Sequence, residues 1–124
     1  MYANGMGFII AQVRISHPQD GKKVLKMDLL VDTGALYSVI PERSLKSIGI
    51  EAKKRQVFTL ANGTQLTRHI GVAWFSLKGR ETGAPVIFGQ RGDKPLLGVT
   101  ALEALGFEID PIHRRLKRSK LFLL

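Results

Sequence analysis

The stretch Leu29-Leu30-Val31-Asp32-Thr33-Gly34-Ala35 leads a short apolar run directly into a carboxylate, a hydroxyl and a glycine. Apolar and polar residues alternate from Val24 onward, which predicts a strand that ends at Asp32. Two interpretations of the Asp-Thr-Gly triplet are open. It is an ordinary turn, in which the aspartate caps the backbone and the glycine supplies a positive φ, or it presents a reactive carboxylate at the end of a strand. Such a triplet arises by chance in roughly 3% of chains of this length, so its surroundings must decide.

The composition predicts one globular domain, 1–124, in which residues 1–7 are expected to be flexible and 119–124 to form a tail. Hydrophobic residues make up 44% of the chain, and its 13 glycines indicate many turns. There is no cysteine, which excludes disulfides, thiol nucleophiles and cysteine-ligated zinc. No apolar run approaches the roughly 20 residues that span a bilayer, and no secretion signal is recognised, so a cytoplasmic location without a membrane partner is expected.

The net charge of +9 is the strongest compositional bias. Basic residues gather at 53–55 and again at Arg114, Arg115, Lys117, Arg118 and Lys120. Such clusters bind phosphate backbones or attract acidic partners, but they also occur as plain solvated faces. Because no nucleic-acid-binding motif or interleaved aromatic residues accompany them, the solvated face is the favoured interpretation. A basic nucleic-acid-binding β domain is the weaker alternative.

The rest of the chain predicts mostly strands. Alternation, apolar runs and turn residues indicate strands at 8–15, 24–32, 37–40, 57–60, 65–78, 85–88, 107–109 and 115–121, with turns at 61–64 and 78–83. A short helix is expected from Pro41 to Gly49. Thr100 and Glu103 match a capping box that begins a second helix, which Gly106 ends. These elements predict a mainly β, mostly antiparallel domain with one well-supported helix in its C-terminal half.

Three motifs occur together in an order that is typical of one family. They are Leu30-Val31-Asp32-Thr33-Gly34-Ala35 followed by Ser38, the hairpin turn at Asn62-Gly63, and Leu96-Leu97-Gly98 leading into 100–106. On these motifs the chain resembles the retropepsin-like, or retroviral-type, aspartic proteases, and in particular their small cellular relatives in bacteria and archaea. The resemblance implies a closed or partly open barrel of antiparallel strands that forms one lobe of a two-fold dimer, with strand 96–98 passing beside the catalytic loop.

Two positions depart from the retroviral pattern. Retroviral members carry an aspartate two residues after the glycine of the triplet and an arginine after the second glycine motif, and these pair near the subunit contact. Leu36 and Val99 stand at those positions here. An apolar contact is therefore expected in place of the ion pair, and the cellular branch is favoured. The hairpin tip at 61–64 also lacks the glycine-rich sequence of viral flaps.

The resemblance implies roles for individual residues. Asp32 is expected to be the acid/base residue that activates the lytic water, Thr33 to hydrogen-bond across a dimer axis, and Gly34 to permit the turn. Substrate contacts are expected from Ala35, Ala61, Asn62, Gly63, Thr64 and Leu97, with 61–64 as the tip of a flap over an extended polypeptide. Tyr37, Ile70, Trp74 and Leu97 are candidates for apolar subsite walls, although packing in the core is the favoured interpretation of all four.

No cofactor or metal is expected. The three histidines, His17, His69 and His113, lie far apart in the sequence and show no metal-ligand spacing. A Ser-His triad would also need a convergence that the sequence does not indicate.

Peptide hydrolysis by carboxylates needs one ionised group to accept a proton from water and one protonated group to donate to the carbonyl oxygen. The other aspartates, Asp20, Asp28, Asp93 and Asp110, are not followed by Thr-Gly or Ser-Gly. The second carboxylate is therefore expected from Asp32 of another copy in a symmetric homodimer. The leading hypothesis is a homodimeric aspartic endopeptidase that acts on extended polypeptides. A catalytically silent dimerisation or peptide-binding module of the same fold is the alternative.

Overall fold

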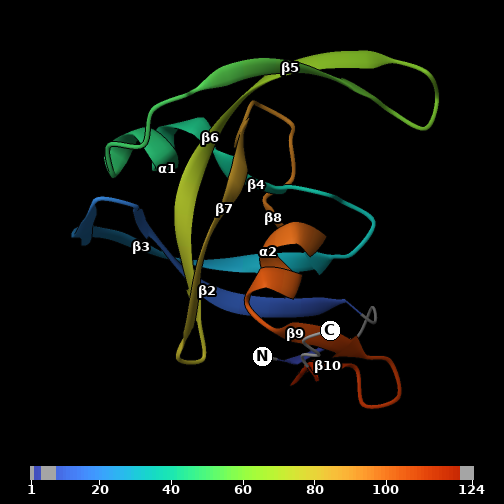
Figure 1. Cartoon of the computed structure of the whole chain (residues 1–124). Helices are drawn as coiled ribbons and strands as arrows, with labels where there is room; N and C mark the ends of the chain where they lie inside the picture. The colour runs from blue at the N-terminus through green and yellow to red at the C-terminus, as the bar shows by residue number, and fades with distance from the viewer. Residues whose placement is uncertain (1, 4–7, 121–124) are drawn as a thin grey trace, which may run out of the picture.

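The computed structural model describes residues 2, 3 and 8–120, and its architecture is mainly β (Figure 1). The strands are β1 (Tyr2–Ala3), β2 (Ile9–His17), β3 (Asp20–Asp32), β4 (Ser38–Pro41), β5 (Lys54–Thr59), β6 (Gln65–Leu77), β7 (Arg80–Gly89), β8 (Leu96–Gly98), β9 (Phe107–Asp110) and β10 (Arg115–Arg118). The helices are α1 (Glu42–Ser47) and α2 (Val99–Ala104), with 6 residues each. The prediction of a mainly β fold is confirmed. Both expected helices are present, and the one in the C-terminal half, which the sequence supported better, is no longer than the other.

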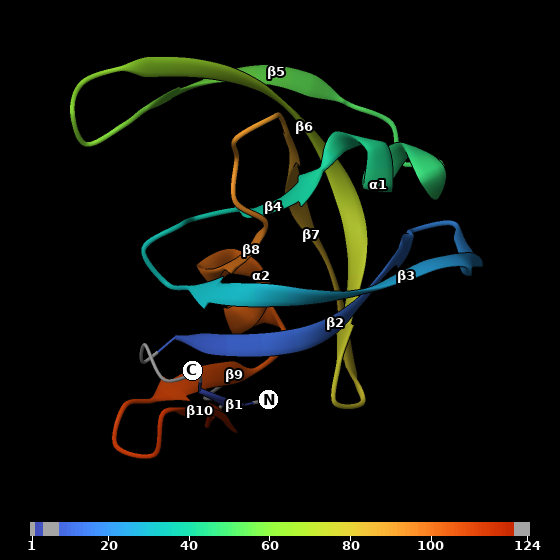
Figure 2. The ribbon, with the colours of Figure 1, turned by 180° about the vertical axis from the view of Figure 1, so that it is seen from behind.

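The main sheet curves back on itself (Figures 1 and 2). Its strands are ordered β1-β2-β3-β8-β4-β7-β6-β5, and β2 also pairs with β6 through Ile15 opposite Phe75. Because this extra pairing joins two strands that are far apart in the order, the six strands β2-β3-β8-β4-β7-β6 close into a ring. β5 lies outside that ring, and β9 and β10 form a separate two-stranded sheet.

Two pairs of strands in the mostly antiparallel sheet are parallel, which the sequence did not indicate. β3 runs parallel to β8 up to Asp32 opposite Gly98, and β4 runs parallel to β7. Parallel neighbours need long connections, and here these connections bring strands from the C-terminal half beside residues 30–41. As a result β8 lies between β3 and β4, and therefore between the two ends of the loop 33–37.

The alternation predicted for β3 is present in the structure. Leu29 is fully buried and Val31 is almost so, whereas Lys26 and Asp28 on the other face are exposed. Burying a side chain the size of leucine stabilises the fold by about 1.5–3 kcal/mol. The core cluster around Leu29 therefore fixes the strand that carries Asp32.

β7 begins earlier than the sequence predicted. The expected turn at 78–83 shrinks to Lys78 and Gly79, both with positive φ, and the strand starts at Arg80. Gly83 lies inside this strand opposite Trp74, where a Cβ would come within 3.2 Å of the indole ring. This glycine makes room for an aromatic side chain and does not mark a turn.

The chain ends are partly described. Tyr2–Ala3 pairs with β2 as β1, so these two residues differ from the expected flexible segment 1–7, of which residues 1 and 4–7 lie outside the described residues. The final hairpin is present, but its second strand ends at Arg118, and residues 121–124 of the expected tail also lie outside the described part. None of the helices in residues 2–3 and 8–120 is long and apolar enough to cross a membrane.

Candidate active site

Asp32 is the last residue of β3 and is half-buried. The Gly34 amide donates to Asp32 Oδ1 at 2.9 Å, and the Ala35 amide donates to the Asp32 carbonyl oxygen at 3.2 Å. The Asp32 side chain thus caps the backbone, as the ordinary-turn interpretation expected, but Gly34 does not adopt the positive φ that this interpretation gave it. A Cβ at Gly34 would lie 3.2 Å from Asp32 Oδ1, which is tight. The loop therefore holds one carboxylate oxygen with a backbone amide, while Thr33 and Gly34 are exposed beside it.

Gly98 of β8 lies opposite Asp32 in the sheet and contacts both ends of the loop 33–37. Its amide donates to Oγ of Ser38, which is 1% exposed, at 3.0 Å. Asp32 and Ser38 are the residues that flank the loop 33–37, and both contact the same glycine. The place of 96–98 beside the Asp32 loop, which the resemblance implied, is thus present.

The start of α2 corrects the predicted capping box. The helix begins at Val99 with Gly98 as its N-cap, and no side chain caps it. Instead the Val99 amide donates to the Ala35 carbonyl at 2.8 Å and the Thr100 amide to the Leu36 carbonyl at 3.1 Å. Free amides at a helix start need acceptors, and the Asp32 loop supplies them, so the Thr100 hydroxyl is not required.

The hairpin expected around Asn62-Gly63 is present as β5 and β6. Its turn is closed by the Gly63 amide on the Leu60 carbonyl at 2.9 Å and by the Thr64 amide on Asn62 Oδ1 at 2.9 Å. Gly63 has a φ of 85°, as a tight Asn-Gly turn requires. Ala61, Asn62, Gly63 and Thr64 are all exposed. In both views the hairpin extends over the side of the molecule on which the loop 33–37 lies (Figures 1 and 2).

An ion pair that the sequence did not indicate joins this hairpin to the β7–β8 loop. Arg68 Nε donates to Asp93 Oδ2 at 2.7 Å and Nη2 donates to Oδ1 at 2.9 Å. The hydrogen bonds from Arg68 are the main reason why the pKa of Asp93 lies below its ordinary value, against the effect of burial, and the Gln90 amide adds to the lowering. The same bonds raise the pKa of Arg68. The partners are 25 residues apart, so no local pattern could have shown the pair.

The four candidates for subsite walls have different surroundings. Leu97 is fully buried and Ile70 is 4% exposed, so both side chains pack in the interior. The expected substrate contact of Leu97 is therefore not supported, because this side chain of β8 packs in the buried core cluster. Tyr37 and Trp74 are half-buried, and the Trp74 indole NH donates to Glu81 Oε2 at 3.2 Å.

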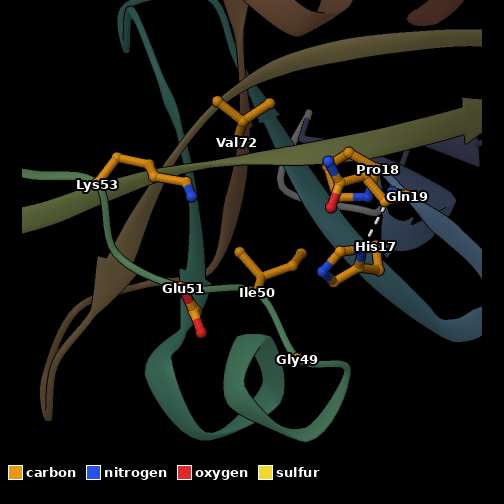
Figure 3. A pocket seen from close by; sticks show the side chains of 8 residues that line it. All are labelled: His17, Pro18, Gln19, Gly49, Ile50, Glu51, Lys53 and Val72. Atoms are coloured by element: carbon orange, nitrogen blue, oxygen red, sulfur yellow. Dashed lines mark hydrogen bonds between the residues drawn. The ribbon is translucent and has the colours of Figure 1, made fainter.

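One surface groove lies away from Asp32. It has a volume of about 330 Å³ and lies between the β2–β3 turn, the segment after α1 and β6, with His17, Ile50 and Val72 among its lining residues (Figure 3). The groove is at the start of β3 and Asp32 is at its end, which corresponds to roughly 40 Å of strand. The loop around Asp32 is thus an exposed edge in the single chain rather than part of this groove.

The histidines lie apart in the structure as well. His17 Nδ1 accepts a hydrogen bond from the Gln19 amide, and His113 pairs with Asp110 at 2.7 Å in the β9–β10 turn. The His113 hydrogen bond is the main cause that lowers the pKa of Asp110. Within residues 2–3 and 8–120 no group of three or more histidine, aspartate or glutamate side chains could hold a metal ion.

Comparison with known proteins defines the class. The family model for aspartyl proteases matches residues 11–101, so the chain belongs to the aspartyl protease family, a family of hydrolases. No curated protein matches the chain.

Two solved structures share the fold. One is the solution structure of simian foamy virus (mac) protease, with 20% identity, a TM-score of 0.54, and coverage of 77% of this chain and 93% of that one. The other is the crystal structure of a retropepsin-like aspartic protease from Rickettsia conorii, with 23% identity, a TM-score of 0.53, and coverage of 89% and 90%. The predicted retropepsin-like fold is confirmed.

Proposed function

We propose that the chain is one subunit of a homodimeric aspartic endopeptidase whose active site contains Asp32 from each of two copies. The observation that carries this proposal is the Asp32 loop, which the Gly34 amide, β8 and the start of α2 hold in place at an exposed edge. Membership of the aspartyl protease family supports it. A lone carboxylate at an edge is half of a site, and a two-fold axis supplies the other half.

The proposed reaction is general acid/base catalysis. Two carboxylates about 3 Å apart repel each other by roughly 5 kcal/mol at an effective dielectric constant of 20, so the pair shares one proton over a range of acidic to neutral pH. This sharing is the established behaviour of aspartic protease dyads. The ionised Asp32 accepts a proton from water, which attacks the peptide carbonyl carbon, while the protonated Asp32 donates to the carbonyl oxygen. The carboxyl that took the proton from water then gives it to the leaving nitrogen as the carbon–nitrogen bond breaks. One hydroxyl of the intermediate returns its proton to the other Asp32, so the carboxyl group of the product forms and the pair again holds one proton.

Other loop residues are proposed to build the dimer and the cleft. Thr33 is exposed next to Asp32 and would hydrogen-bond to its counterpart across the axis. Leu36, with 60% of its surface exposed, would replace the ion pair of retroviral members with an apolar contact. The turn 61–64 is proposed to close over an extended polypeptide and align it through backbone hydrogen bonds.

The first test is cleavage of an unfolded polypeptide at mildly acidic pH. Wild-type protein is expected to cleave it, and Asp32→Asn is expected to abolish cleavage because the asparagine cannot share the proton. Asp28→Asn is a matched control, since Asp28 is exposed on the same strand four residues earlier. Cleavage that survives Asp32→Asn would remove Asp32 from the mechanism.

Mixing the two proteins tests the shared site. If each site needs Asp32 from both copies, an equal mixture of wild-type and Asp32→Asn chains that has exchanged subunits retains about one quarter of the activity. Independent single-chain sites would retain about one half and would contradict the dimer.

A further inference from the structure

The β5–β6 hairpin leaves the ring as a two-stranded arm. β6 pairs with β7 from Ile70 onward, whereas residues 65–69 pair with β5 alone, and β5 pairs with β6 alone among the described strands. A two-stranded ribbon is at best marginally stable by itself. The position of this arm over the Asp32 loop therefore depends on contacts between its inner face and the body of the protein.

Arg68 lies on that inner face. Residues 66, 68 and 70 of β6 are half-buried or buried, whereas Thr67 and His69 between them are exposed. The Arg68 side chain is only 17% exposed and its partner Asp93 only 22%. Among residues 2–3 and 8–120, this ion pair is the one side-chain hydrogen-bonded link from residues 54–69 to the rest of the chain. The β7–β8 loop that carries Asp93 lies beneath the hairpin in both views (Figures 1 and 2).

Asp93 is itself held in place by hydrogen bonds within its loop. The Gln90 amide donates to Asp93 Oδ2 at 2.8 Å, and the Asp93 amide donates back to the Gln90 carbonyl at 2.9 Å. Gln90 Nε2 reaches Glu42 Oε2 of α1 at 3.3 Å. From Asp93 the chain runs within a few residues into β8, where Gly98 lies opposite Asp32. A short, hydrogen-bonded path therefore connects the hairpin to the strand beside the candidate catalytic carboxylate.

We propose that Arg68 and Asp93 are positioning residues that hold the β5–β6 hairpin over the Asp32 loop through this two-bond ion pair. The pair keeps the strand edge of the hairpin ordered before substrate arrives, so less ordering is needed when an extended polypeptide binds. A guanidinium that makes two parallel bonds to one carboxylate fixes orientation as well as distance. This proposal rests on the proposed function only in so far as the hairpin is the flap of that site.

The test compares Arg68→Gln and Asp93→Asn with wild-type protein in two measurements. Amide hydrogen exchange is expected to become at least about fivefold faster in 55–68 and in 90–95, with β2 and β3 unchanged, because the arm loses its anchor. For cleavage of a long peptide, KM is expected to rise about tenfold while kcat changes by less than about threefold, since binding and not chemistry is affected. The charge-swapped pair Arg68→Asp with Asp93→Arg is expected to recover part of both losses.

Lys117→Gln is the control, because it removes an exposed ion pair with Glu108 on the separate β9–β10 hairpin. Folded single variants with unchanged hairpin exchange and unchanged KM would overturn the proposal, and so would an equal increase in exchange across the whole chain. If wild-type protein does not cleave peptides, the proposed function fails, and the exchange measurement alone still decides whether the ion pair orders the hairpin.

Discussion

Gly98 leaves no space for a side chain, because a Cβ there would lie 2.5 Å from the Tyr37 carbonyl carbon and 2.8 Å from the Ser38 nitrogen. Both contacts are with backbone, which cannot rotate away. Gly98→Ala is therefore expected to push the loop 33–37 off β8 and to lower the free energy of unfolding by about 3 kcal/mol or more. The measurement is urea unfolding at fixed protein concentration.

Gly21→Ala is the matched control for this substitution. A Cβ at Gly21 meets nothing within 4 Å, and its φ is not positive. Its effect on the free energy of unfolding is expected to stay within about 0.5 kcal/mol. Equal losses in the two variants would show that the close approach at Gly98 does not hold the Asp32 loop.

At this scale the sequence indicated the carboxylate but not its supports. Asp32 could be placed at the end of a strand because the alternation of β3 is a local pattern. Ser38 was part of the first motif, but no local pattern could show that its hydroxyl accepts from an amide 60 residues away. Leu97 was a candidate substrate contact only by resemblance, and its burial follows from the place of β8 between β3 and β4, where Leu97 joins the core cluster.

Among the elements, the contact between β6 and the β7–β8 loop has a defined pH dependence. Arg68 lowers the pKa of Asp93 in the folded protein below the ordinary value of 3.8, so the unfolded chain binds this proton more readily. The stabilisation from the pair is therefore complete above about pH 4 and is lost as the pH falls through the lowered pKa. A double-mutant cycle with Arg68→Gln and Asp93→Asn is expected to give a coupling of about 1–2 kcal/mol at both pH 7 and pH 5.

The same cycle at pH 3 or below is expected to give a smaller coupling, provided that the protein is still folded there. A coupling that is constant from pH 7 to below pH 3, or one that is already lost at pH 5, would contradict the assignment of the pair. Persistence at pH 5 matters for the proposed function, because the flap must keep its anchor in the mildly acidic range where the enzyme is expected to work.

The elements differ in how well the sequence predicted them. The Asn-Gly turn and the Pro41-to-Gly49 helix were predicted correctly, because turn and helix-end chemistry is local. The start of α2 was not, because its cap is a pair of carbonyls from the Asp32 loop. β7 was predicted too short, since Gly83 is explained only by the Trp74 ring across the sheet.

For the whole molecule, the order of elements and three short motifs were enough to predict the fold, whereas the proposed dimer is not a property of one chain. The strongest indication of an interface near the site is Leu36, an apolar side chain that the Asp32 loop leaves 60% exposed. Its carbonyl is held by the Thr100 amide, so the position of the backbone does not depend on the side chain. Leu36 can therefore be changed without removing the loop's own hydrogen bonds.

Leu36→Asp is expected to raise the dissociation constant of the proposed dimer at least about tenfold. A symmetric interface would receive two like charges at an apolar contact. Sedimentation velocity over a range of concentrations measures the shift, and cleavage is expected to recover as the protein concentration rises. Val57→Asp is the matched control, because Val57 is 56% exposed on β5. A Leu36→Asp protein that dimerises like wild type would place the interface elsewhere, and a concentration-independent loss of cleavage would indicate damage to the loop itself.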